Sequence, residues 1–296
     1  MPKIVTVIAT VFITLACLAC EKAPEVKKTE QYTFEQRVLL RTIEFEEEIQ
    51  SYMDSRSTVG LCVIVTRADT IFYKNYFGYK DVDSRSKIDD KTLFRIASIS
   101  KSFSSVAIMQ LIEQGKVTLD TDASTLLPFK LRNPNYPDTP ITVEMLLDHT
   151  SSLCDYNGYG TLDVINTSYK NYAKAYRNRA PGSGYEYCNL NYSILGAIIE
   201  KLSGERFDKY IKAHILDPLG IDGGFCCDDL NSQRFASIYT VNASGTPAKS
   251  AAYSNLGSKL NTYTIGYDAP LFSPAGGMKI SAPDLAKYMI MHRNFG

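Results

Sequence analysis

The sequence of 296 residues lacks several features that mark common classes of protein. It has no tryptophan, only three histidines and no net charge, because 32 basic residues balance 32 acidic ones. The lack of tryptophan excludes nothing by itself. The charge balance gives no electrostatic surface for nucleic acid, so no nucleic-acid partner is expected. His149, His214 and His292 are too few and too scattered to indicate a metal centre or an obvious catalytic triad.

Cysteine is also scarce once the N-terminus is set aside. Two of the seven cysteines lie within the first 20 residues, and five remain: Cys62, Cys154, Cys188, Cys226 and Cys227. The count is odd and these five contain no Cys-x-x-Cys, so neither structural zinc nor any other cofactor is expected. A disulfide between Cys154 and Cys188 stays open, since it requires that their segments meet.

One apolar run, residues 4–19, follows a lysine near the start of the chain. It is too short to span a bilayer comfortably and ends in small residues, which predicts an export signal over residues 1–20. Ala19-Cys20 resembles the end of a bacterial lipoprotein signal, in which Cys20 would be lipidated. Cys17 is the alternative acceptor, and plain secretion or an uncleaved anchor also stay open. Residues 21–32 would form a polar tether, placing the protein in a bacterial cell envelope, anchored by lipid and facing the periplasm or exterior.

Hydrophobic spacing predicts helices alternating with a few strands. Residues 33–54 have apolar side chains at helical spacing, and residues 59–67 and 70–79 are β-branched and aromatic on either side of a turn, which indicates a hairpin. From residue 220 to 271 few periodic signals survive. Further helices are predicted at 106–112, 142–147, 190–202, 207–216 and 282–291.

The pattern Ser-x-x-Lys occurs twice, as Ser84 with Lys87 and as Ser98 with Lys101. A chain of this length contains about one copy by chance. The Ser84 copy lies in a polar run with no apolar helix behind it, which is typical of a solvated loop. The Ser98 copy leads into the apolar helix, and its alternative interpretation is a serine helix cap beside an exposed lysine.

Chemistry gives the Ser98 copy a second interpretation. Residues three apart on a helix share one face, so the Ser98 hydroxyl and the Lys101 amine would come into contact. A serine becomes a nucleophile when a neighbouring base takes its proton, and a lysine can be that base when burial and nearby cations lower the pKa of an amine. The N–H groups of a helix N-terminus also favour the oxyanion of acyl transfer.

A second candidate motif is Tyr187-Cys188-Asn189, which follows a Pro-Gly-Ser-Gly turn and leads directly into a helix. Tyr-x-Asn alone is uninformative, because it also begins at Tyr73, Tyr169, Tyr176 and Tyr253. The alternative for Tyr187 is a buried tyrosine bonded to backbone. The alternative for Asn189 is a helix N-cap, which is compatible with a functional role.

Read together and in order, segments 94–103, 146–153, 181–196 and 275–286 resemble the serine β-lactamase and penicillin-binding-protein superfamily. The branch is that of class C β-lactamases, D-alanyl-D-alanine carboxypeptidases and related esterases. The resemblance runs from about Thr33 to the end. It implies an α+β fold, with an antiparallel sheet flanked by helices beside an all-helical lobe at roughly 115–270, in a domain covering 33–296.

The resemblance also implies roles for four residues. Ser98 matches the acylated nucleophile and Lys101 the base that activates it. Tyr187 matches the tyrosine that shares protons with this lysine and helps to activate the deacylating water or acceptor. Asn189 matches the residue whose amide holds the amide group of the substrate. An ammonium beside a phenol favours the phenolate, so these roles are chemically consistent.

The pattern of the superfamily breaks near the C-terminus. Its third motif, Lys or His followed by Thr or Ser and Gly, does not occur after Gly277. His149-Thr150-Ser151 is only superficially similar, since it precedes the tyrosine motif and matches a Leu-Leu-x-His-Thr-Ser-Gly-Leu segment that we interpret as structural, with Ser152 in place of Gly. By this resemblance the C-terminal strands are missing, so we expect a fragment of a longer enzyme rather than a natural truncation, poorly stable and at best weakly active alone.

Two functions of different classes follow. The first is a serine hydrolase that forms an acyl-enzyme on D-Ala-D-Ala-type peptidoglycan peptides, β-lactams or small esters. The second is a non-catalytic envelope lipoprotein, a binding or remnant protein, which the absent third motif favours. The choice of substrate depends on loops at 155–178, whose shape the sequence does not determine.

Overall fold

The computed structural model describes residues 33–242, 244–250 and 253–294. The predicted export signal, the tether and both candidate lipidation sites, Cys17 and Cys20, lie outside the described residues. Within that part of the chain, none of the helices combines the length and the apolar character that a membrane span requires. The described part divides into two compact units, which are considered one at a time.

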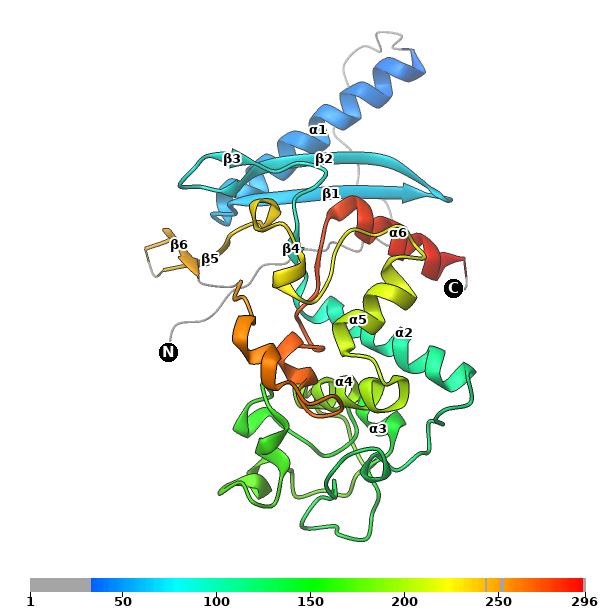
Figure 1. The fold of residues 1–296 in the computed structure, drawn as a ribbon. Coiled ribbons are helices and arrows are strands. Elements are labelled where there is room, and N and C mark those ends of the chain that lie inside the picture. The colour runs from blue at the N-terminus through cyan, green and yellow to red at the C-terminus, as the bar shows by residue number, and fades with distance from the viewer. Residues whose placement is uncertain (1–32, 243, 251–252, 295–296) are drawn as a thin grey trace. The chain divides into compact units, whose positions relative to one another are not determined.

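Among the described residues, the first unit comprises 33–63, 74–89, 237–242 and 244–250. Helix α1 (Phe34–Ser55) begins with a capping box, in which the Thr33 side chain accepts from the amide of Gln36 and the Gln36 side chain accepts from the amide of Thr33. Asn75 on strand β2 donates to Glu46 of α1 at 2.7 Å, which ties the helix to the strand. The helix and the strand lie next to each other in Figure 1. The predicted helix at 33–54 is confirmed.

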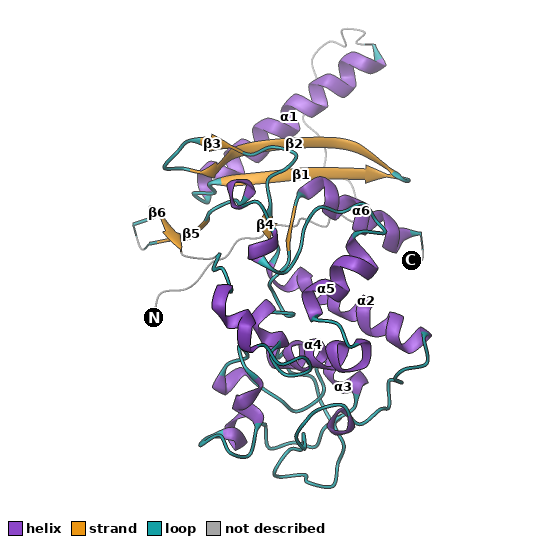
Figure 2. Cartoon of the chain, viewed as in Figure 1, coloured by secondary structure: helices purple, strands orange, loops and turns teal. Residues whose placement is uncertain are grey.

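A small antiparallel sheet contains β1 (Gly60–Arg67), β2 (Thr70–Asp81) and β3 (Ser86–Lys87) in that order. The predicted hairpin is therefore confirmed, and β3 adds a strand that the sequence did not predict. A separate hairpin of β5 (Ile238–Val241) and β6 (Pro247–Ser250) was also missed, because its residues are mostly exposed and alternate weakly (Figure 2).

The second unit contains residues 64–73, which form the turn end of the β1–β2 hairpin, the described helices that follow β3, and one two-stranded ladder. Strand β4 (Phe94–Arg95) pairs with β7 (Lys279–Ile280), so that Phe94 lies opposite Ile280. These strands are too short for a periodic signal. The helices are α2 (Ser100–Glu113), α3 (Val143–Leu147), α4 (Asn189–Ser203), α5 (Phe207–Ile211), which continues in a π-helical turn (Lys212–Leu216), and α6 (Ala282–Arg293).

Helix α4 forms the centre of this unit, since every residue from position 190 to 200 is buried. It packs against α2, α3 and α5 and ends at Gly204, whose φ of 75° suits glycine. Gly196 faces Pro274, and a Cβ at this position would lie 2.5 Å from the Pro274 ring. The close approach brings the segment that precedes β7 directly onto α4.

Short 3₁₀ helices occupy much of the chain between these elements, where the sequence predicted irregular structure. They span Ala97–Ile99, Ala123–Thr125, Asp155–Asn157, Leu162–Ile165, Tyr172–Ala175, Cys227–Asp229, Ser232–Arg234, Gly257–Thr262 and Ala269–Phe272.

Candidate active site

Ser98 lies in the 3₁₀ turn between β4 and α2, and its side chain is exposed. The preceding residue, Ala97, has a φ of 45°, a left-handed conformation that is unfavourable for a residue with a Cβ. This turn brings the chain from the β4–β7 ladder into α2 with Ser98 at the bend. The serine is therefore not the cap of α2, because that helix begins at Ser100 after Ile99.

Lys101 lies in the first turn of α2 and is only 7% exposed. Its ammonium donates to three acceptors: Ser98 Oγ at 3.3 Å, Asn189 Oδ1 at 2.7 Å and the Ala275 carbonyl at 2.9 Å. Three acceptors match the three protons of an ammonium. The alternative of an exposed lysine is thus wrong, and the predicted contact between Ser98 and Lys101 is present.

Tyr187 approaches Ser98 from the segment that precedes α4. Its hydroxyl donates to Ser98 Oγ at 2.6 Å, and 45% of the residue is exposed. Lys101 Nζ lies 4.7 Å from the centre of the Tyr187 ring, within the range of a cation–π interaction. Hydroxyl protons rotate freely, so the short contact allows a proton to pass in either direction between the two oxygens.

Asn189 is the first residue of α4, and Cys188 occupies the N-cap position. The side chain of Asn189 does not cap the helix. Its Oδ1 accepts from Lys101, while its Nδ2 donates to Asp155 at 2.8 Å. The structure thus brings Ser98, Lys101, Tyr187 and Asn189 together, although they come from two segments about 90 residues apart.

The segment that follows Phe272 forms the remaining wall of this cluster. Besides the Ala275 carbonyl, Pro274 accepts from Ser104 Oγ at 3.0 Å and the Met278 amide donates to Ser100 Oγ at 3.0 Å. These contacts fix the backbone on α2. A backbone carbonyl has no side-chain signature, so the contact of Ala275 with the lysine could not be predicted from the sequence.

His149 holds the Tyr187 segment in place, which fits its predicted structural role. Its carbonyl accepts from the Glu186 amide at 2.9 Å, and its Nδ1 accepts from the Cys188 amide at 3.2 Å. The imidazole also packs on the Tyr187 ring, with 4.6 Å between ring centres. Burial and, secondly, the charge of Lys101 lower the pKa of His149, which keeps Nδ1 available as an acceptor.

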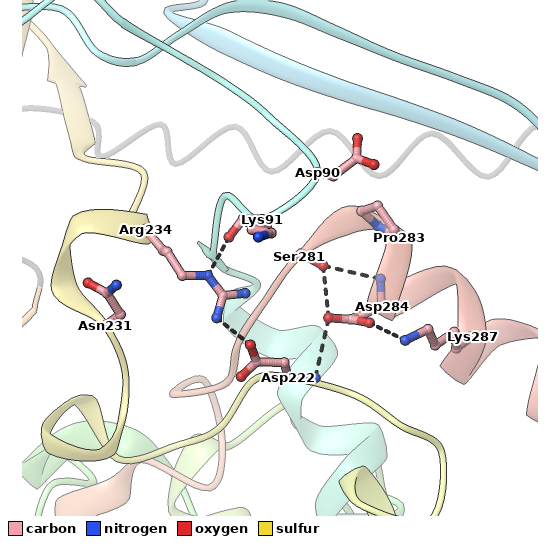
Figure 3. Close-up of a pocket in the computed structure, with 9 residues that line it drawn as sticks. All are labelled: Asp90, Lys91, Asp222, Asn231, Arg234, Ser281, Pro283, Asp284 and Lys287. Atoms are coloured by element: carbon pink, nitrogen blue, oxygen red, sulfur yellow. Dashed lines mark hydrogen bonds and ion pairs between the residues drawn. The ribbon is translucent and has the colours of Figure 1, made fainter.

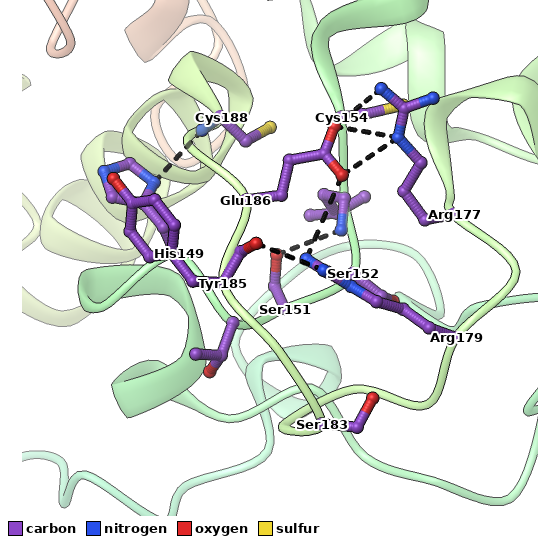
Figure 4. A network of polar contacts seen from close by, with 12 residues as sticks. His149, Ser151, Ser152, Cys154, Arg177, Arg179, Ser183, Tyr185, Glu186 and Cys188 are labelled. Atoms are coloured by element: carbon purple, nitrogen blue, oxygen red, sulfur yellow. Dashed lines mark hydrogen bonds and ion pairs between the residues drawn. The ribbon is translucent and has the colours of Figure 1, made fainter.

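Two cysteines, Cys154 and Cys188, lie in the polar network around His149 (Figure 4). Cys154 Sγ donates to the Lys174 carbonyl and Cys188 Sγ donates to Asp155, both at 3.3 Å. Both cysteines are free, as are the other three in the described residues, so the Cys154–Cys188 disulfide is not formed. The thiols have separate acceptors on different segments.

Two other polar groupings lie outside this cluster. A groove of about 520 Å³ is lined by charged side chains that are already paired, such as Arg234 with Asp222 at 2.5 Å and Lys287 with Asp284 at 2.6 Å (Figure 3). Asp208, Cys226 and Asp229 place potential metal ligands within 4.8 Å of one another. Both carboxylates are engaged, Asp208 by Arg206 and Asp229 by Lys209.

Comparison with known proteins identifies a matching family and several relatives of similar sequence. A model of the β-lactamase family matches residues 45–295. The chain is 28% identical over 211 residues to protein flp of Staphylococcus aureus (strain MRSA252), a match that covers 70% of this chain and 42% of flp. It is 31% identical over 202 residues to esterase EstB of Burkholderia gladioli, covering 62% of this chain and 51% of EstB.

A solved structure shares the fold. The octameric penicillin-binding protein homologue from Pyrococcus abyssi superposes with a TM-score of 0.70 and 28% identity, covering 86% of this chain and 56% of that one. The chain spans about half the length of the curated relatives that it matches.

Proposed function

Because the chain belongs to the β-lactamase family, we propose that it acts as a serine hydrolase through an acyl-enzyme on Ser98. The observation that carries the proposal is the 2.6 Å contact of Tyr187 Oη with Ser98 Oγ beside the buried Lys101. An exposed hydroxyl in contact with two groups that exchange protons is the arrangement that nucleophilic catalysis requires.

In the first step, Ser98 Oγ forms a bond to the carbonyl carbon of the substrate. Its proton passes to Tyr187 Oη as phenolate or to a neutral Lys101 Nζ. The bond from the carbonyl carbon to the leaving group then breaks, and the same proton is delivered to that group. A water molecule then loses a proton to the same pair and adds to the carbonyl carbon of the resulting ester. The bond from that carbon to Ser98 Oγ breaks, Oγ takes the proton back from the pair, and the acid is released.

The proposed substrates are D-Ala-D-Ala-type peptides, β-lactams or small esters. Two relatives support this range, since one is named an esterase and another is a penicillin-binding protein homologue. In this role Asn189 would contact the substrate amide, using the part of its side chain that Lys101 and Asp155 leave accessible.

The proposal is tested by intact-protein mass spectrometry after incubation with a fluorescent penicillin and, separately, with a fluorophosphonate. We expect a mass increment that is lost in Ser98→Ala. Ser84→Ala is the matched control, because Ser84 begins the other Ser-x-x-Lys copy and hydrogen-bonds Asp81 and Ser86 instead. The reagent that labels narrows the substrate class. A folded chain that neither reagent labels would support the non-catalytic binding protein.

Lipid anchoring at Cys20 forms a second part of the proposal. It rests on the apolar run and on Ala19-Cys20. We expect an alkyne-bearing fatty acid fed to expressing cells to label the protein and Cys20→Ala to abolish the label. Unchanged labelling of Cys20→Ala, with loss in Cys17→Ala, would move the anchor to the other cysteine.

A further inference from the structure

Asp155 receives four hydrogen bonds from three consecutive residues at the start of α4. Oδ2 accepts from the backbone amide of Asn189 at 3.0 Å and from its Nδ2 at 2.8 Å. Oδ1 accepts from the Leu190 amide at 3.0 Å and from Cys188 Sγ at 3.3 Å. Both oxygens of the carboxylate are therefore occupied by donors.

Helix α4 needs such a partner because its own N-cap residue supplies none. The first amides of a helix have no intrahelical acceptor, and Cys188 makes no side-chain cap bond. Burial, and secondly the charge of Asp155, raise the pKa of the Cys188 thiol. The thiol thus remains a proton donor, and the carboxylate satisfies the helix start from a distant loop.

The contact with Nδ2 has a consequence beyond capping. An amide side chain has a donor end and an acceptor end, and exchanging them changes what it offers to each neighbour. With Nδ2 held by Asp155, Oδ1 of Asn189 points to Lys101 Nζ at 2.7 Å. The opposite orientation would place two donors, the amide nitrogen and the ammonium, against each other.

We propose that Asp155 is a positioning residue that fixes the Asn189 amide with its oxygen toward Lys101. The proposal rests on the proposed function, because its effect on turnover requires Lys101 to serve Ser98. Asp155 acts through Asn189, and the loop aspartate thereby determines one of the three hydrogen bonds of the lysine.

The loop that carries Asp155 is fixed to its surroundings on both sides. The Cys154 amide donates to the Ala175 carbonyl at 2.8 Å, just before the aspartate. Ser193 Oγ on α4 donates to the Tyr159 carbonyl at 2.7 Å, just after it. The backbone on either side of Asp155 is therefore held by contacts that do not involve the Asp155 side chain, and one of them is to α4.

Asp155→Asn is the most informative substitution, because it keeps the size of the side chain. Of the two ends of the new amide, only the oxygen accepts hydrogen bonds from the Asn189 and Leu190 amides. The nitrogen end would face donors where a second acceptor was needed. With its oxygen toward the amide of the buried Leu190, the new side chain turns its nitrogen toward Asn189 Nδ2. We then expect the Asn189 side chain to turn, so that its hydrogen bond with Lys101 is lost.

The kinetic test measures, per folded protein, the rate at which a fluorophosphonate phosphonylates Ser98, with loss of fluoride, in the wild type and in Asp155→Asn. We expect a loss of about 10- to 100-fold, as when an orienting partner of a metal-bound histidine is removed. Asp163→Asn is the matched control, since Asp163 lies in the neighbouring 3₁₀ helix and bonds Thr161 and Tyr267. A rate equal to that of this control would overturn the proposal, even if the melting temperature falls.

A double-mutant cycle distinguishes positioning from simple capping. If Asp155 acts through Asn189, adding Asp155→Asn to Asn189→Ala should change this phosphonylation rate less than about twofold. Capping alone predicts that the two losses multiply, because the backbone amides remain in both backgrounds. Multiplicative losses would therefore contradict the proposal.

A spectroscopic readout separates this proposal from the proposed function. In ¹H–¹⁵N spectra the Asn189 side-chain amide should show one proton protected from exchange, and Asp155→Asn should remove that protection. Protection that survives the substitution overturns the positioning role whether or not Ser98 is acylated. If Asp155→Asn removes the protection but neither reagent labels the wild type, the positioning role of Asp155 stands and the hydrolase function is rejected.

Discussion

Ser98 and Ser84 each precede a lysine by three residues, yet the two serines have different surroundings. Lys101 is buried and donates to Ser98, Asn189 and Ala275. Lys87 lies on a two-residue strand, with its ammonium 3.9 Å from the centre of the Tyr79 ring, and Ser84 bonds Asp81 in a turn. The spacing is shared, so the difference comes from partners that are distant in sequence.

Replacing each lysine by methionine should separate the two copies most strongly. Lys101→Met removes the ammonium from Ser98 and is expected to lower the acylation rate by at least about 10³-fold. Lys87→Met should leave the rate unchanged, because it loses only a cation–π contact. The rates of both variants can be measured with a chromogenic ester. Similar small losses in Lys101→Met and Lys87→Met would contradict a special role for the Ser98 copy.

The hydroxyl of Tyr187 is expected to have the next largest effect. Tyr187→Phe keeps the ring on His149 and removes the oxygen that lies 2.6 Å from Ser98 Oγ. We expect a loss of about 10²- to 10³-fold in the acylation rate. Tyr185→Phe is the control, since Tyr185 is 65% exposed and its ring also contacts His149, edge-on, with 5.9 Å between ring centres. A loss that is equal in both variants would argue against proton transfer through Tyr187.

The packing behind Ala275 can be tested through Gly196. A methyl group there would lie 2.5 Å from Pro274 and 3.2 Å from the Ala269 Cβ. We expect Gly196→Ala to lower the free energy of unfolding by about 1–3 kcal/mol. Gly160→Ala has open space around its Cβ, so it should stay within about 0.5 kcal/mol of the wild type. Urea denaturation of the two variants would reveal the difference.

The stability should also depend on pH through His149. Its folded-state pKa lies below the ordinary value of 6.5. The unfolded chain therefore binds a proton first, and folding stability falls as the pH drops below about 6.5, by up to about 1.4 kcal/mol per unit until the folded-state pKa is reached. Melting temperatures between pH 5 and 8 should show this slope.

His149→Asn should flatten that slope, because an asparagine oxygen can accept in place of Nδ1 and asparagine tolerates the φ of 65° at this position. A slope that persists in the variant would assign the titration to another group.

The smallest effect is expected at the Ser84 turn. Hydrogen bonds from Lys249 and Ser237 lower the pKa of Asp81. A carboxyl group whose pKa is lowered by folding stabilises the fold at pH values above its unfolded-state pKa. This stabilisation is lost as the pH falls and the group is protonated. Asp81→Asn should lower the melting temperature slightly at pH 7 and less in high salt, without changing acylation. A change in acylation would mean that the two serine turns are coupled.

The elements with strong local signals were predicted well. Helix α1 has Thr33 and Gln36 as a capping box, and α4 has a continuous buried face that ends at Gly204. The two-residue strands β4 and β7 were missed, because their pairing joins positions about 185 residues apart and two residues carry no periodicity.

The candidate site shows the same division between local and distant information. The sequence named Ser98, Lys101, Tyr187 and Asn189, which the structure brings together. Asp155 was only one residue of a loop whose shape was left open. The one indication available in the sequence was the lack of a capping side chain at Cys188. Because the first amides of that helix have no local acceptor, they need one from another segment.

The left-handed φ of Ala97 means that the turn before Ser98 is locally frustrated. A glycine at position 97 would adopt this φ without strain. The alanine that is present costs the fold about 1–3 kcal/mol in backbone strain. Backbone freedom and preorganisation of the serine thus oppose each other at this one position. Selection for thermal stability alone would favour Ala97→Gly or a rearranged turn, and it would loosen the geometry that presents the hydroxyl.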